Sequence, residues 1–143
     1  MGKQLGVISK PEVPIEMQEQ YISFVLSSSI SAFDGLGKEL KRKRPELYPE
    51  KPKNIFQNIS ALDDHLNKLI SKQLTDYDQL FKMFQVRHII EHNMGVIDED
   101  FVKKIPTYRD MLRRKYPLTS DEVNRFLSQM KELGQIIRTH FKK

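Results

Sequence analysis

The sequence predicts an all-α protein, a small antiparallel bundle of four to five helices. Apolar residues recur at helical spacing over most of the chain, and no stretch alternates apolar and polar residues as a half-buried strand does. The periodic stretches are separated by prolines and glycines. With 143 residues the chain has the length of one domain. We therefore expect residues 1–143 to form a single domain, with residues 1–14 as a flexible N-terminal arm.

The first periodic stretch begins at Ile15 and ends before Pro45, because the residue preceding a proline avoids helical backbone angles. Gly35 and Gly37 lie inside it, and each glycine costs a helix about 1 kcal/mol relative to alanine. We therefore expect a kink or a break near these glycines. The three prolines that follow predict an extended loop over residues 44–53.

An apolar stripe, whose members are spaced alternately four and three residues apart, predicts a second helix. The other face of this helix carries Asp63 and Asp64, which we expect to be exposed to water. The stripe consists of Ile55, Ile59, Leu62, Leu66 and Leu69.

A third helix is expected to begin near Thr75, where Thr75 and Asp78 can cap the first turn. It is expected to end at residues 93–95, because Gly95 suits the left-handed conformation that commonly closes a helix. Residues 96–118 are predicted to be irregular or to hold one short helix.

The last helix has a well-defined start. Thr119 and Glu122 have the spacing of a capping box, and Leu118 and Val123 that of a hydrophobic staple. The phenylalanines of the helical stretches are expected in the core of the bundle: Phe24, Phe33, Phe81, Phe84 and Phe126.

The amino-acid composition limits the kinds of partner and of chemistry that the chain can have. The 24 Lys and Arg residues exceed the 19 Asp and Glu residues by five, which favours polyanionic partners such as RNA, DNA or anionic lipid. The chain has no cysteine, which excludes disulfide scaffolds, Cys-ligated zinc, iron–sulfur clusters and thiol catalysis. We expect a cytoplasmic protein, because nothing requires an oxidising compartment. No run of about 18 apolar residues is present, so we expect that nothing in the chain spans a bilayer, and we expect no membrane partner.

Side chains with chemical ability gather at the end of the third predicted helix, in the sequence Arg87-His88-Ile89-Ile90-Glu91-His92-Asn93. The simplest explanation is structural, since cationic side chains at a helix C-terminus are stabilised by the helix dipole by about 0.3–1 kcal/mol each. An Arg and two His residues in the last turns need no further role on that explanation.

Two functional interpretations compete with it. His88, Glu91 and His92 spell H-x-x-E-H, the motif of inverted zinc peptidases. Such a site needs a third protein ligand and a sheet edge for the peptide, and an all-helical chain supplies no sheet. The other interpretation pairs Arg87 with His92 on a phosphodiester, because histidine can exchange the proton and arginine can hold the phosphate. Five helical positions separate these two side chains by about 140° and 7.5 Å, so one helix does not aim both at one atom unless its end unwinds. A phosphodiester spans several ångströms, however, so arginine can hold the phosphate while histidine reaches the sugar hydroxyl.

The pattern Arg87-His88, three residues, His92-Asn93 resembles the signature of the HEPN superfamily of small helical bundles. In that family an Arg is followed by a polar residue, a position that His88 fills, and four to six residues separate the Arg from a His near a helix end. The continuation His-Asn-x-Gly-x-Ile-Asp is matched from His92 to Asp98. The motif covers about seven residues, the wider match extends to Phe101, and the four-helix layout agrees over the rest of the chain.

The resemblance implies a metal-independent endoribonuclease without a cofactor, in which two protomers line one composite cleft. It implies that Arg87 and His92 are catalytic, that His88 and Asn93 position RNA or the catalytic His, and that Glu91 orients a neighbour or is solvated. The implied partners are RNA, a second copy of the chain, and an antitoxin or inhibitor protein in a toxin–antitoxin or defence setting. In one branch of the family, toxins that a partner nucleotidyltransferase modifies carry Tyr two places after the His. This chain has Met94 at that place and so departs from that branch.

The family also implies an alternative, because many members have lost catalysis and serve as dimerisation or nucleotide- or RNA-binding modules. The basic residues that follow the motif are candidates for guiding RNA in either case, because they lie near His92 in sequence. They are Arg109, Arg113 and Arg114.

Overall fold

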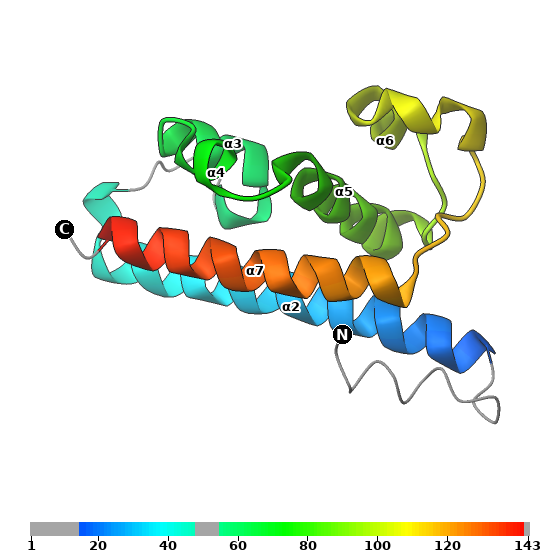
Figure 1. Ribbon diagram of the computed structural model, residues 1–143, viewed down its shortest axis with the longest axis horizontal. Coiled ribbons are helices and arrows are strands. Elements are labelled where there is room, and N and C mark those ends of the chain that lie inside the picture. Colours follow the sequence, from blue (N-terminus) through cyan, green and yellow to red (C-terminus); the bar gives the residue numbers. More distant parts are fainter. Residues whose placement is uncertain (1–14, 48–54, 142–143) are drawn as a thin grey trace.

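The computed structural model describes residues 15–47 and 55–141 and confirms the all-α bundle. Two long helices, α2 (Ile15–Lys43) and α7 (Ser120–Phe141), lie side by side, and α5 (Tyr77–Asn93) packs on both (Figure 1). The predicted arm, residues 1–14, lies outside the described residues. In chain order the shorter elements are the 3-10 helices η2 (Pro45–Leu47) and η3 (Ile55–Gln57), the α-helices α3 (Ile59–His65), α4 (Leu69–Gln73) and α6 (Glu99–Lys104), and the 3-10 helix η4 (Pro106–Met111).

The three long helices are joined in an up-down-up order. Ile22 near the start of α2 and Val123 near the start of α7 are buried in one cluster, so these two helices run in the same direction. Phe84 in the first half of α5 packs on Phe33 in the second half of α2, with ring centroids 6.2 Å apart. The expected antiparallel arrangement therefore holds between successive long helices, and it makes the first and the third parallel.

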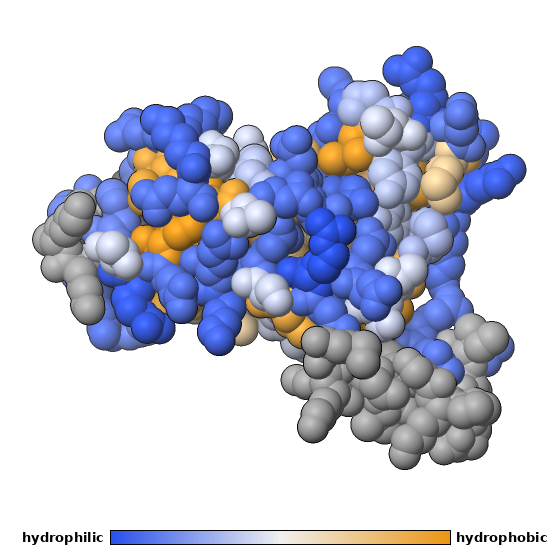
Figure 2. Space-filling model, viewed as in Figure 1, coloured by the Kyte–Doolittle hydropathy of each residue, from blue (hydrophilic) through white to orange (hydrophobic). Residues whose placement is uncertain are grey.

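The core lies between these helices and is aromatic at its centre. The Phe33 ring also lies 4.9 Å from that of Phe56, and the Phe84 ring lies 6.0 Å from that of Phe126. Figure 2 shows a mostly hydrophilic face on which apolar side chains appear in small patches. Of the helices that the structure describes, none is long and apolar enough to cross a membrane.

The predicted interruption of the first helix at Gly35 and Gly37 is wrong. Helix α2 continues through both residues. A Cβ atom on Gly37 would clash with the ring of Phe56, whereas one on Gly35 would meet nothing within 4 Å. Gly37 therefore lets η3 approach α2 closely, and the packing of Phe56 offsets the propensity cost of the glycine.

The predicted second helix is divided into η3, α3 and α4. Asn67 and Lys68 both have positive φ angles, 57° and 66°, which interrupt the helical path between α3 and α4. The expected exposure of Asp63 is also wrong, because this residue is only 1% exposed. Its carboxylate accepts a hydrogen bond of 2.9 Å from the backbone N–H of Ser71, which the turn brings over it. Asp64 is exposed, as predicted.

Helix α5 begins at Tyr77, and Thr75 does not cap it. The backbone N–H and the hydroxyl of Thr75 instead donate to the carboxylate of Glu132 on α7, at 3.2 and 3.4 Å. The start of α5 is thus fixed by α7, a contact between residues far apart in the sequence.

The start of α7 agrees with the sequence in two respects and differs in one. Thr119 Oγ1 accepts a hydrogen bond of 3.2 Å from the N–H of Glu122, and Leu118 packs against Val123. The side chain of Glu122 accepts a hydrogen bond from Tyr116 at 2.7 Å instead of closing the capping box. Half of the predicted box therefore forms.

Between α5 and α7 the chain folds out through α6 and η4 and returns along the end of α5 (Figure 1). Ile97 N–H donates to the Arg114 carbonyl at 2.8 Å, and Arg113 N–H donates to the Ile97 carbonyl at 2.7 Å. We call residues 113–116 the return segment. Its backbone is held against the residues that directly follow the motif.

Candidate functional site

The motif residues lie on the last two turns of α5. Val86 and Ile89 are buried in the core and hold these turns in place. The remaining motif side chains project from other faces of the helix, where His88, Glu91 and His92 are exposed. Helix α5 thus presents the predicted catalytic residues at the edge of the core.

Arg87 is the most buried of the charged motif residues, with 16% of its side chain exposed. Its Nη2 atom lies 2.8 Å from a carboxylate oxygen of Glu91, one helical turn further on. Its Nε atom is buried and has no hydrogen-bond partner. An unpaired buried donor is costly, so the ion pair with Glu91 does not satisfy every donor of this guanidinium.

His88 and His92 form a second pair on α5. Their ring centroids lie 4.6 Å apart with an interplanar angle of 50°, and both residues are exposed. The helix remains regular through Asn93, so it does not unwind to bring Arg87 and His92 together. The side chains of Arg87 and His92 therefore leave the helix about 140° apart.

Asn93 is engaged in closing the helix. Its side-chain amide donates to the Val96 carbonyl at 2.8 Å, and the N–H of Gly95 donates to the Ile89 carbonyl at 2.8 Å. Both Met94 and Gly95 have positive φ angles, 57° and 80°, so two residues in succession make the left-handed turn predicted for Gly95 alone. The contact of Asn93 fixes the loop after His92.

The predicted guiding residues fall into two places. Arg113 and Arg114 are exposed on the return segment, beside Ile97. Arg109 is exposed on η4, in the part of the chain that folds out beyond α6. The structure therefore places two of the three arginines on backbone that is bonded to the loop after the motif.

A polar cluster that the sequence did not reveal anchors the return segment. Tyr116 is 5% exposed, and its hydroxyl donates to Glu122 at 2.7 Å. Lys82 of α5 lies 3.1 Å from the same carboxylate and donates to the Tyr108 hydroxyl, also at 3.1 Å.

Burial raises the pKa of Tyr116 far above its usual range, and the hydrogen bonds to Tyr108 and Glu122 add to this effect. Burial opposes the charge of Lys82, but its hydrogen bonds with Tyr108 and Glu122 leave its pKa raised.

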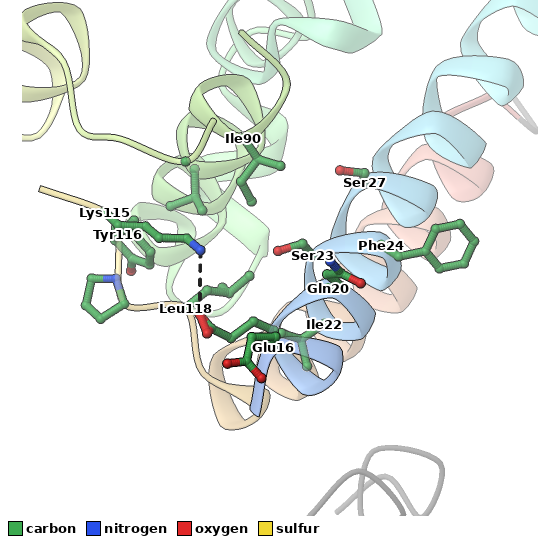
Figure 3. Close-up of a pocket in the computed structure, with 14 residues that line it drawn as sticks. Glu16, Gln20, Ile22, Ser23, Phe24, Ser27, Ile90, Lys115, Tyr116 and Leu118 are labelled. Carbon is green, nitrogen blue, oxygen red and sulfur yellow. Dashed lines mark ion pairs between the residues drawn. The ribbon is translucent and has the colours of Figure 1, made fainter. Parts of the chain in front are cut away.

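A pocket of about 640 Å³ lies between the first turns of α2 and the end of α5 (Figure 3). Ile90 and Ser23 line its sides, and Lys115 of the return segment crosses it to pair with Glu19 at 3.6 Å. Phe24, which was predicted to be in the core, also lines the pocket and is 68% exposed. The core prediction for Phe24 is therefore wrong.

The zinc-peptidase interpretation gains no support from the geometry. Within residues 15–47 and 55–141, no group of three or more His, Asp or Glu side chains is arranged to hold a metal ion. The carboxylate of Glu91 is turned to Arg87. The described residues form no strand beyond an isolated bridge of Val96 with Lys115, so the sheet edge that such peptidases use is absent from them.

Comparison with known proteins gives no relative: no family model, no curated protein and no solved structure matches the chain. The side chains at the end of α5 and the resemblance of their pattern are therefore the remaining indications of function.

Proposed function

We propose that the chain is a metal-independent endoribonuclease of the HEPN type that acts as a homodimer. The composite site is inferred from one observation. Helix α5 is regular through Asn93, and this separates Arg87 and His92 by about 140° around the helix. A single regular helix then does not aim both side chains at one atom of the phosphate group. Two copies related by a twofold axis can do so, because each of the two sites in their shared cleft takes Arg87 from one protomer and His92 from its partner.

The chemistry follows from the two side-chain types. Cleavage of RNA without metal needs a base for the 2′-hydroxyl proton, an acid for the leaving 5′-oxygen, and positive charge beside the phosphorane. The exposed imidazole of His92 suits proton transfer. The part of the Arg87 guanidinium that remains exposed, in a side chain 16% exposed, suits a charge-assisted hydrogen bond to a phosphate oxygen.

The surroundings of the motif support RNA as the polyanion. Arg113 and Arg114 extend positive charge along the return segment from the end of α5. Each phosphate contact adds affinity that falls as salt rises. On this proposal the protein works in the cytoplasm, in a toxin–antitoxin or defence role restrained by an antitoxin or inhibitor protein.

A second candidate is a non-catalytic HEPN-type module that dimerises or binds nucleotide or RNA. The ion pair between Arg87 and Glu91 favours it, because the guanidinium is mostly buried and already neutralised by a carboxylate. A catalytic Arg87 has to exchange part of that contact for phosphate.

The two candidates are separated by cleavage assays on a mixed-sequence RNA. The enzyme cuts RNA in the presence of EDTA, and cutting is lost in His92→Ala and in Arg87→Ala. Circular dichroism and thermal unfolding of both variants confirm that they remain folded. A folded wild-type chain that binds RNA and never cuts it between about pH 5 and 8, the range in which histidine changes its charge, identifies the module.

A further inference from the structure

The two imidazoles at the end of α5 have an arrangement that the RNase chemistry does not require. His88 and His92 are one helical turn apart, both are exposed, and their ring centroids lie 4.6 Å apart. Two imidazoles at this spacing on one helical face can direct a nitrogen each toward one ion between them. Imidazole nitrogen is a preferred ligand of Zn²⁺, Ni²⁺ and Cu²⁺, whereas Mg²⁺ prefers oxygen.

The surrounding charges leave room for a cation. Arg87, the adjacent positive residue, is neutralised by Glu91 at 2.8 Å. The carbonyl end of α5 carries the partial negative charge of the helix dipole, which stabilises positive charge in the last turn. The helix end is fixed by the hydrogen bond from Asn93 to Val96, so little ordering of the backbone accompanies binding.

We propose that His88 and His92 together bind one divalent transition-metal ion, with water completing its coordination. The ion is an inhibitor and not a cofactor. This second statement rests on the proposed RNase function, because a metal ion on the ring of His92 occupies the nitrogen lone pair that proton transfer needs. His88 is thereby assigned a regulatory role as the second ligand.

The metal site is tested by titrating the full chain, without a histidine tag and after removal of metals by a chelator, with Ni²⁺ and Zn²⁺ in a calorimeter. We expect one ion per chain in the wild type and no binding of Mg²⁺. Loss of one imidazole converts a chelate into a single contact, so His88→Gln weakens binding about a hundredfold. His92→Gln has the same effect, which provides a second variant with an independent substitution.

His65→Gln is the matched control, since it removes an exposed histidine at the end of α3, away from the motif. It is expected to bind metal as the wild type does. Absence of saturable binding by the wild type overturns the proposal. Equal affinities of His88→Gln and His65→Gln also overturn it, because the ion then lies elsewhere.

The inhibitory role has its own measurement. Zinc lowers the cleavage rate of the wild type and of His65→Gln at least tenfold, and excess EDTA restores it. In His88→Gln the ratio of the rates with and without zinc stays near one, whatever its rate without zinc. Metal binding without any RNA cleavage contradicts the proposed function and leaves the two-histidine site standing. Cleavage that zinc does not alter contradicts the inhibitory role.

Discussion

The guanidinium of Arg87 lies 2.8 Å from the carboxylate of Glu91, one turn away on α5, while Nε of the same guanidinium is buried without a partner. Nη2 of Arg87 is thus held by the ion pair with Glu91, whereas Nε is enclosed without a hydrogen-bond partner. On the proposed function, Glu91 orients Arg87 in the unbound chain and competes with phosphate for it.

Replacing Glu91 should tighten RNA binding. Glu91→Gln removes the carboxylate that competes for Arg87, and we expect a gain of about three- to tenfold in affinity, because a partly buried pair of this kind is worth about 1 kcal/mol. Fluorescence anisotropy with a labelled RNA measures it. Asp64→Asn is the matched control: it removes the same charge and an exposed ion pair of the same spacing, between Asp64 on α3 and Lys68 just before α4. Equal effects of the two substitutions would show that net charge alone is responsible.

The return segment should contribute to RNA binding through phosphate contact. Arg114→Ala is expected to weaken binding and to reduce the slope of log affinity against log salt by about 0.7, the value for one phosphate of a single strand. Arg138→Ala, an exposed arginine near the end of α7, should leave the slope unchanged. An unchanged slope in Arg114→Ala would remove the return segment from the RNA surface.

Two neighbouring glycines should respond in opposite directions to the same substitution. Gly37→Ala places a methyl group against Phe56 and is expected to lower the free energy of unfolding by about 1–3 kcal/mol. Gly35→Ala adds a methyl group in open space on the same helix and is expected to raise it by about 0.5–1 kcal/mol. Urea unfolding measures both. A stabilised Gly37→Ala would contradict the close approach of η3 to α2.

Tyr116 should make stability fall in alkaline solution. Its folded pKa lies above the ordinary value near about 10, so the unfolded chain loses the phenol proton first. The stabilisation is complete below about pH 10 and declines as the pH rises further. Tyr116→Phe lowers stability near neutral pH by about 1.5–3 kcal/mol, through loss of the hydrogen bond to Glu122, and flattens the alkaline decline. Urea unfolding at a series of pH values measures both effects. Tyr21→Phe, outside the cluster, should keep the wild-type slope.

The sequence predicted those features that depend on neighbouring residues. The end of α5 at Asn93, the end of α2 before Pro45, and the start of α7 after Thr119 all follow from local backbone preferences. Features that depend on distant residues were missed. In the continuous helix α2, Gly37 packs against the distant Phe56. The burial of Asp63 depends on a turn at Asn67 and Lys68 that the apolar stripe does not reveal.

The candidate site shows the same division. The sequence located the motif on the last turns of a helix and gave the angle between Arg87 and His92. It did not reveal that Glu91 binds Arg87, although the spacing of four residues permits that pair. The sequence did not predict the cluster of Lys82, Tyr116 and Glu122, because α5, the return segment and α7 meet only in the folded chain.

The composite cleft is tested most directly by a mixed dimer. Differently tagged Arg87→Ala and His92→Ala chains are co-expressed, and the heterodimer is isolated through both tags, which are then removed. If each site takes its arginine from one protomer and its histidine from the partner, the heterodimer has one intact site and one empty site. We then expect about half of the wild-type rate per dimer, although both homodimeric variants are inactive. A heterodimer as inactive as its parents, from a dimeric wild type that cuts RNA, would contradict the composite site.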